Sequence, residues 1–206
     1  MSQFADDTLL YSTAPTAEAQ IAELNADLAR IQQWCDTWRV DLKPSKCRHL
    51  VFDSRGRRDA NATAAALTDR LALPSADGSS QTIPTAGSYR LLGVTFTSNL
   101  RFDKHVEEGP LKALTSQVGF LKRLTGGLGS EKRRVAAVIY SGVVRPRAEY
   151  ASTVWRPGTS PALLEKLDVV QRKIARFVVG SATIVSNVAL LAEVGWPTLE
   201  DRHTEQ

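Results

Sequence analysis

The sequence contains few cysteines and no long apolar run. Its 206 residues include two cysteines, Cys35 and Cys47, too few for a disulfide framework and typical of a reducing compartment. No apolar run approaches the roughly 20 residues of a membrane-spanning helix, so we expect no membrane partner. Residues 1–7 have neither the basic nor the apolar segment of a secretory signal. The sequence therefore predicts an intracellular protein.

The signatures of several common sites are also missing. The three histidines, His49, His105 and His203, are not spaced like zinc ligands, either from each other or from the cysteines. The sequence has no P-loop, no dinucleotide-binding fingerprint and no activated serine or cysteine nucleophile. These absences argue against a zinc protein, a nucleotide-cofactor enzyme and a serine or cysteine hydrolase.

Apolar residues and charges are present in an informative arrangement. Hydrophobic residues make up 43% of the chain, enough for one substantial core or two small ones. The formal net charge is +4, but residues 1–29 contain five acidic residues and no Lys or Arg, whereas residues 101–176 contain 15 Lys and Arg against seven Asp and Glu. This asymmetry indicates an acidic site and a surface that binds polyanions, although charged helix faces are also often merely solvated.

Residues 1–52 predict a hairpin, a long helix and a strand. Strand patterns at 3–5 and 8–11 flank an Asp-Asp pair, which we expect in the connection because Asp favours turns. A helix should follow Thr16 as its N-cap, since apolar residues then recur at spacings of three and four as far as Trp38. A further strand is predicted at 47–52.

The rest of the chain divides into an irregular stretch, a strand pair and helices. Residues 53–88 predict an irregular insert with a short helix near 63–71, and residues 89–96 predict a strand pair. From residue 101 the period is helical, and a kink is expected at Pro146. Helices are predicted at about 105–124, 130–144, 160–179 and 185–194. Core packing is expected for all four tryptophans, Trp34, Trp38, Trp155 and Trp196. The predicted fold class is α+β, with a mixed domain at 1–100 and an all-α domain at 101–206.

The order of several short boxes is more specific than any one of them. An Asp-Asp pair alone is often an ordinary polar turn. Here Phe4-Ala5-Asp6-Asp7 is followed by a long helix, then Lys43-Pro44-Ser45-Lys46-Cys47, then Leu92-Gly93-Val94 and a basic helical region. This series resembles palm motifs C, D and E of the reverse transcriptases of non-LTR (LINE-type) retrotransposons. Val144-Arg145-Pro146, Glu149-Tyr150-Ala151-Ser152 and residues 191–202 resemble the thumb and the stretch after it.

The resemblance implies a partial polymerase palm followed by a thumb-like helical region. Its chemistry would be metal-assisted nucleotidyl transfer by an RNA-directed DNA polymerase, with two Mg²⁺ ions held by oxygen ligands. Asp6 is implied as the stronger metal ligand and catalytic residue, with Asp7 as its supporting neighbour. Lys46 matches the motif D lysine, a general acid for the pyrophosphate, and a solvated lysine is the open alternative.

The resemblance also implies nucleic-acid partners: an RNA template and a DNA primer, or their hybrid, with dNTP as the substrate of the intact enzyme. Leu92, Gly93 and Val94 correspond to the primer grip, and the alternative for Gly93 is a simple β-bulge. Backbone phosphates would be contacted by basic thumb residues. These are Lys122, Arg123, Lys132, Arg133, Arg134, Arg145 and Arg147. A regular helix cannot present all of them on one face, so we expect some to be merely solvated.

The chain begins three residues before Phe4, whereas motifs A and B precede motif C in this family. Motif A supplies a third carboxylate and motif B shapes the nucleotide pocket, so we expect no DNA synthesis by this chain alone, and its Mg²⁺ binding is in doubt. The alternatives are a non-catalytic nucleic-acid-binding module or an inert relic of a retroelement. A purely structural helical domain would leave Asp6 and Asp7 unexplained. A nuclear location is implied by the resemblance only.

Overall fold

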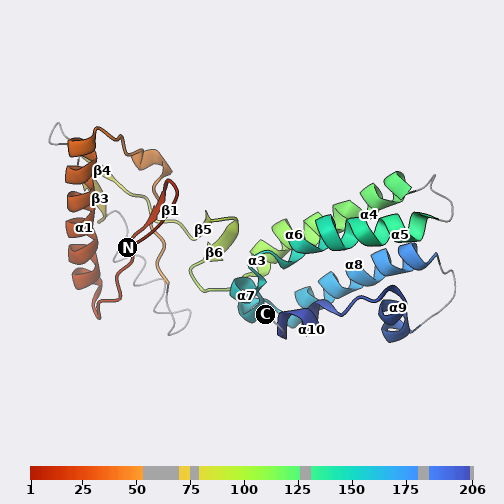
Figure 1. The fold of residues 1–206 in the computed structure, drawn as a ribbon. Coiled ribbons are helices and arrows are strands. Elements are labelled where there is room, and N and C mark those ends of the chain that lie inside the picture. Colours follow the sequence, from red (N-terminus) through yellow and green to blue (C-terminus); the bar gives the residue numbers. More distant parts are fainter. Residues whose placement is uncertain (53–69, 75–78, 126–130, 181–185, 205–206) are drawn as a thin grey trace. The chain divides into compact units, whose positions relative to one another are not determined.

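The chain forms two compact units in the computed structural model (Figure 1), which describes residues 1–52, 70–74, 79–125, 131–180 and 186–204. The first unit comprises Met1–Tyr89 with Thr97–Leu100, and the second comprises Arg90–Phe96 with Arg101–Gln206. Residues 90–96, expected in the first domain, therefore group with the helical region. Among the described residues, no helix is both long enough and apolar enough to cross a membrane.

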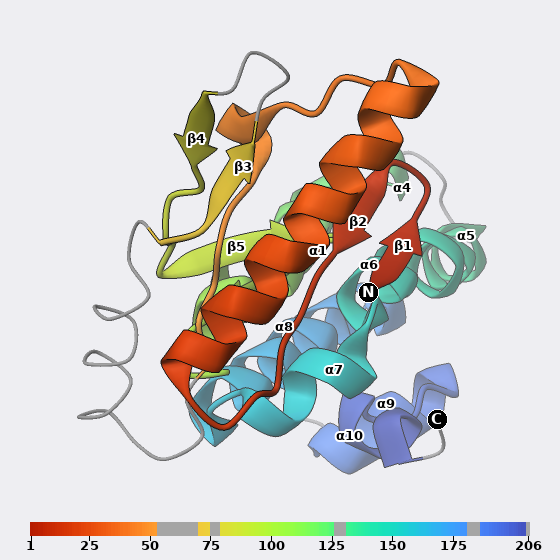
Figure 2. The ribbon, with the colours of Figure 1, turned by 90° about the vertical axis from the view of Figure 1, so that its left-hand side faces the viewer.

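The first unit contains one long helix and two short strand pairs. Its elements are β1 (Ser2–Phe4), β2 (Asp7–Leu9), α1 (Ala17–Trp38), the 3-10 turn η1 (Pro44–Lys46), β3 (Ala72–Pro74) and β4 (Ser80–Thr82). Strands β1 and β2 pair antiparallel, as do β3 and β4. Figure 2 shows α1 beside β3, against which it packs.

Helix α1 begins and ends as its sequence dictates. The Thr16 side chain accepts a hydrogen bond from the Ala19 amide at 3.2 Å, which confirms the predicted N-cap. The helix stops at Arg39, whose left-handed backbone (φ 54°) closes the last turn. Its buried residues include Ile21 and Leu28. These join a small core with Val51, Leu71, Leu73 and Ile83.

Two expectations for the first unit were wrong. Residues 47–52 form no regular strand; His49 makes a single parallel bridge to Thr85. Residues 53–88 are not irregular throughout, because β3 and β4 lie within them and Leu73 and Ile83 contribute to the core. Strands of three residues are too short to show a period among Pro, Gly and Ser. The helix expected near 63–71 falls largely outside the described residues.

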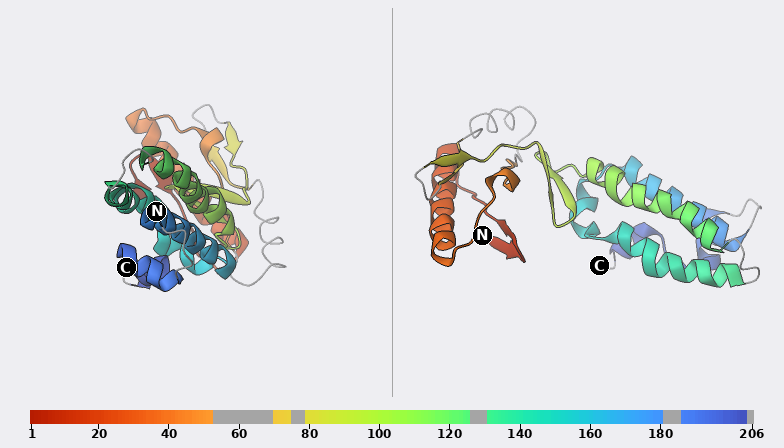
Figure 3. Two further views of the ribbon diagram at one scale, coloured as in Figure 1. Left: turned by 90° about the vertical axis from the view of Figure 1, so that its right-hand side faces the viewer. Right: turned by 90° about the horizontal axis from the view of Figure 1, so that it is seen from above.

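The second unit is most of a hairpin, residues 90–96, followed by a helical bundle. The hairpin is β5 (Ser88–Leu91) with β6 (Val94–Thr97). The helical elements are α3 (Asp103–Val106), the π-turn η2 (Glu107–Leu111), α4 (Lys112–Thr125), α5 (Lys132–Ile139), the π-turn η4 (Tyr140–Val144), α6 (Arg145–Glu149), α7 (Ser152–Trp155), the 3-10 turn η5 (Arg156–Gly158), α8 (Pro161–Val179), α9 (Asn187–Val194) and α10 (Leu199–Thr204). Helices α4, α5 and α8 run side by side (Figures 1 and 3).

A π-turn lies beside Pro146 in the α5–α6 segment, and the kink expected there stays a prediction. Proline lacks an amide hydrogen, and its ring crowds the carbonyl four residues earlier. The wide π-turn η4 directly precedes Arg145 and Pro146, so the backbone remains helical from Lys132 to Glu149. A second π-turn, η2, accommodates Pro110 in the same way.

The tryptophans divide between core and surface. Trp155 is fully buried, and Trp196 stacks on the buried Tyr140 ring at 3.9 Å between centroids. Core packing is therefore confirmed for these two. Trp34 and Trp38 are 56% and 66% exposed, so the expectation for them was wrong. The apolar period of α1 continues into its last turns, but there the two rings lie near each other, 6.5 Å between centroids, and remain exposed.

Candidate catalytic and nucleic-acid-binding sites

The Asp-Asp pair lies at the tip of the β1–β2 hairpin. Phe4 pairs with Asp7, so Ala5 and Asp6 form a two-residue turn and Asp7 begins β2. Ala5 has φ 52°, a left-handed conformation that is disfavoured for a residue with a side chain. The Gln3 side chain donates a hydrogen bond to the Ala5 carbonyl at 3.2 Å. Both carboxylates are exposed, so the turn presents them to solvent.

The carboxylates at this tip are suitable ligands for Mg²⁺, but there are too few of them for a complete site. Carboxylate oxygens are the ligands that hard cations prefer. Among the described residues, however, no group of three or more His, Cys, Asp or Glu side chains is placed to hold a metal ion. Asp6 and Asp7 therefore provide part of a metal site.

Lys46 ends the 3-10 turn η1 and is exposed. The turn forms because Pro44 begins it and the Cys47 amide donates to the Pro44 carbonyl at 3.0 Å. Across the described part of the chain, no hydrogen bond or ion pair joins Lys46 to Asp6 or Asp7. Its proposed role as a general acid stays a prediction.

The Leu92-Gly93 pair forms the two-residue turn between β5 and β6, so Gly93 does not lie in a β-bulge. Leu92 and Gly93 have φ values of 45° and 84°. Such a turn joins two strands tightly and suits their twist. Leu92 is 43% exposed, whereas Val94 is buried in the core of the second unit. Of the three residues predicted for the primer grip, the first two therefore form the accessible tip.

A distant tyrosine contacts this turn. The Tyr150 hydroxyl donates a hydrogen bond to the Leu92 carbonyl at 2.9 Å. A Cβ atom on Gly93 would lie 3.2 Å from Cε1 of the same ring. Tyr150 belongs to the stretch that resembles the thumb, but no signal in the sequence links it to Leu92, because the two residues are 58 positions apart.

The hairpin is also tied to α3 by a buried histidine. The Thr95 amide donates a hydrogen bond to Nδ1 of His105 at 3.2 Å. Burial lowers the pKa of His105, and the positive charge of Arg90 lowers it further. A neutral imidazole with a free Nδ1 lone pair is the form that accepts this bond. His105 thus holds the hairpin in place.

Arg145 is committed to an internal ion-pair network. Its Nε lies 3.8 Å from a Glu149 oxygen, and Arg202 donates to both Glu149 oxygens, at 2.6 and 3.2 Å. The Arg145 side chain is 19% exposed. Its predicted role as a phosphate contact has no geometric support, since the guanidinium faces Glu149 inside the unit.

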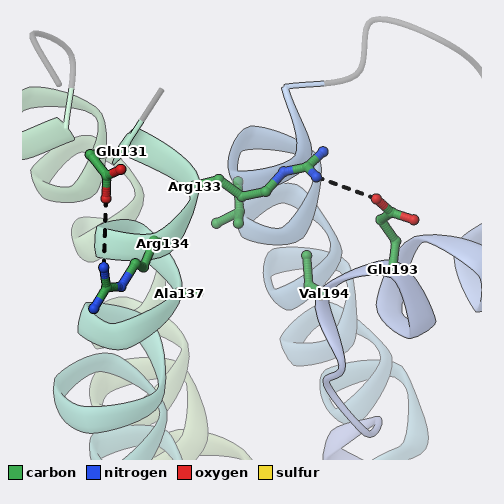
Figure 4. Close-up of a pocket in the computed structure, with 7 residues that line it drawn as sticks. Glu131, Arg133, Arg134, Ala137, Glu193 and Val194 are labelled. Carbon is green, nitrogen blue, oxygen red and sulfur yellow. Dashed lines mark hydrogen bonds and ion pairs between the residues drawn. The ribbon is translucent and has the colours of Figure 1, made fainter. Parts of the chain in front are cut away.

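Arg133 and Arg134 line a pocket of about 360 Å³ that carries both charge signs (Figure 4). Arg133 contacts a Glu193 oxygen at 3.4 Å and donates to the Val179 carbonyl at 3.0 Å. Arg134 lies 3.9 Å from Glu131. Because two carboxylates share this pocket, it is less suited to a phosphate than the sequence suggested.

Two lysines of the predicted phosphate-binding set contact one aromatic ring. Nζ of Lys132 lies 4.2 Å from the centroid of the Phe177 ring, and Nζ of Lys122 lies 6.0 Å from it. The contacts bring α4, α5 and α8 together at this ring. Phe177 lies within the helix predicted at 160–179, and its contact with the two lysines could not be predicted because they lie on other helices. Arg123 and Arg147 are exposed.

The chain is similar to a known transposon protein. No family model and no solved structure matches the chain. Over 204 residues, 98% of its length, the chain is 22% identical to a Drosophila melanogaster protein described as "Probable RNA-directed DNA polymerase from transposon X-element". The chain spans 20% of that protein's length. This similarity supports a reverse-transcriptase-like origin for the chain.

Proposed function

We propose that the chain is the C-terminal palm and thumb portion of a non-LTR retrotransposon reverse transcriptase, and that alone it binds nucleic acid without extending a primer. The similarity over 98% of the chain to a transposon RNA-directed DNA polymerase carries this proposal. The aligned length takes in both the Asp6-Asp7 hairpin and the helical region. A charge-rich domain of unrelated origin would not be expected to align over both.

Asp6 and Asp7 would contribute carboxylate oxygens to Mg²⁺, which in the intact polymerase supplies Lewis-acid activation for nucleotidyl transfer. The described residues supply no third ligand near them. In this proposal the metal site is completed by a carboxylate elsewhere in a longer polymerase. The hairpin therefore positions two ligands and does not form a complete catalytic centre.

We assign nucleic-acid binding to the helical unit. The ion pairs of its basic residues indicate which of them are available to contact phosphates. Arg133, Arg134 and Arg145 each face a carboxylate. Lys122 and Lys132 instead meet at Phe177, and no carboxylate pairs with either in the described ranges. Two ammonium groups without a counter-charge attract phosphate. We therefore expect these two lysines to make the principal backbone contacts, with Arg123 as their neighbour.

The test measures binding of the purified chain to an RNA–DNA hybrid over a series of salt concentrations. Each phosphate contact contributes about 0.9 to the slope of log affinity against log salt for a duplex. The Lys122→Ala/Lys132→Ala variant should therefore reduce the slope by about two. A matched control is Lys112→Ala/Lys166→Ala, which removes the same charge from α4 and α8 and should leave the slope nearly unchanged.

Three results would contradict the proposal. An equal reduction of the salt slope in both double variants would mean that affinity depends only on net charge. Affinity no better than that of an unrelated protein of equal charge would favour an inert relic. Primer extension with Mg²⁺ and dNTP that is abolished by Asp6→Ala would show that the chain is catalytically complete.

A further inference from the structure

The β5–β6 turn has a shape that its own sequence does not favour. Both central residues have positive φ, and such turns prefer Asn-Gly or Gly-Gly. Gly93 meets this requirement. Leu92 does not, because its Cβ atom crowds the backbone in the left-handed region. The turn therefore needs support from outside the hairpin.

Tyr150 provides that support by two contacts. Its hydroxyl donates to the Leu92 carbonyl at 2.9 Å, which fixes the orientation of the Leu92–Gly93 peptide. Its ring lies so close to Gly93 that a Cβ atom there would be 3.2 Å from Cε1. Gly93 is thus required both for its φ and for the approach of the ring.

The backbone around Tyr150 determines the position of its side chain. Helix α6 ends at Glu149, Tyr150 leaves the helix with ψ 123°, and Ala151 turns the chain with φ 52°. Nε1 of the fully buried Trp155 donates to the Tyr150 carbonyl at 2.8 Å. The Tyr150 backbone is therefore anchored to the core, while its side chain remains 57% exposed. Burial does not explain this tyrosine; its contacts with the turn do.

We infer that Tyr150 is a positioning residue that holds the Leu92–Gly93 turn in the shape that contacts the backbone of a nucleic-acid strand. The inference rests on the proposed function, because a primer-grip role for this turn is expected only if the chain is part of a reverse transcriptase. Strain at Leu92, offset by one distant hydrogen bond, is the kind of arrangement found where a turn must keep one shape at a binding surface.

The test is Tyr150→Phe in the full chain, which removes one hydroxyl and keeps the ring. The matched control is Tyr89→Phe, another exposed tyrosine, on β5. Hydrogen exchange of the amides that are hydrogen-bonded between β5 and β6 reports the turn that joins them, and affinity for a primer–template hybrid reports function. Loss of one hydrogen bond of ordinary net strength corresponds to about a fivefold change. We expect faster exchange and weaker hybrid binding of that order in Tyr150→Phe, with the melting temperature lowered by only a few degrees and no change in the control.

The outcomes separate this inference from the proposed function. Wild-type affinity in Tyr150→Phe, or unchanged exchange in the β5–β6 hairpin, would overturn the inference and leave the proposed function standing. Failure of the wild-type chain to bind the hybrid better than a protein of equal charge would overturn the proposed function, and the inference with it. Equal loss of affinity in Tyr89→Phe would also overturn the inference, because the effect would then not depend on the Leu92 contact.

Discussion

The two units contain the same kinds of feature but support them differently. Each has two tryptophans, a two-residue turn with a left-handed residue, and a histidine withdrawn from solvent. In the second unit these features are held by a core of twenty buried residues among those described. In the first the corresponding core has six, and every residue of the β1–β2 hairpin is exposed. An isolated two-stranded hairpin is at best marginally stable.

The difference bears on how function is distributed. The candidate backbone contacts of the second unit lie on helices that pack together, so their geometry is fixed by the chain itself. The candidate metal ligands of the first unit lie on a hairpin whose residues are all exposed. We therefore expect the binding function to survive in this chain and the metal site to depend on additional protein.

The largest expected contrast lies between the tryptophans. Replacing a fully buried aromatic residue by alanine removes about 3–5 kcal/mol of stability, so Trp155→Ala should unfold the second unit or bring it close to unfolding. Trp38→Ala should change stability by less than about 0.5 kcal/mol, because the side chain is exposed. Urea denaturation followed by circular dichroism measures both. A loss of several kcal/mol in Trp38→Ala would show that this side chain is covered in solution.

The second contrast lies between the turns and has opposite signs. Gly93→Ala should destabilise the β5–β6 hairpin by about 1–3 kcal/mol, because alanine is strained at φ 84° and its Cβ meets the Tyr150 ring. Ala5→Gly should stabilise the β1–β2 hairpin by about 0.5 kcal/mol, because it relieves the strain at φ 52°. The greater freedom of glycine in the unfolded chain opposes this gain but is smaller.

Hydrogen exchange of the amides paired across each hairpin measures both effects. Stabilisation by Gly93→Ala would mean that the turn does not adopt a positive φ. Destabilisation by Ala5→Gly would mean that Ala5 is not strained in the folded chain.

Local signals in the sequence predicted much of this fold, and contacts between distant residues account for most of the errors. The N-cap at Thr16 and the helix over Pro161–Val179 are encoded within a few residues, and the structure has both. Trp34 and Trp38 follow the same period as buried residues, so periodicity alone could not place them at the surface. Such a period shows which residues share a face, but not whether the fold covers it.

The candidate site divides in the same way. Asp6 and Asp7 were expected at a hairpin turn, and the structure has Asp6 in the turn and Asp7 beside it. Arg145 was expected to face nucleic acid, but in the structure it pairs with Glu149. Arg202, which is distant in the sequence, pairs with the same carboxylate. Tyr150 and Phe177 were missed because their partners lie in other elements.

The smallest expected contrast lies between the histidines and is read from the pH dependence of stability. Burial lowers the pKa of both His49 and His105, and Arg90 adds to the effect at His105. In the unfolded chain each histidine takes up a proton near pH 6.5, the ordinary histidine pKa. In the folded chain it stays neutral at that pH. Each histidine stabilises its unit fully above that pH, and the contribution falls as the pH drops below it, by at most about 1.4 kcal/mol per pH unit.

His105→Asn isolates the second unit's share of this pH dependence, because asparagine keeps an acceptor for the Thr95 amide but does not titrate between pH 5 and 7. At pH 7.5 the variant should be less stable than the wild type, since it loses ring contact near Trp155, whose centroid is 6.1 Å from that of His105. Between pH 6.5 and 5 its urea midpoint, followed by the helical circular dichroism signal, should fall less steeply than that of the wild type. An equally steep fall would show that His105 is protonated as readily in the folded unit as in the unfolded chain. The hairpin would then be held to α3 without a neutral imidazole.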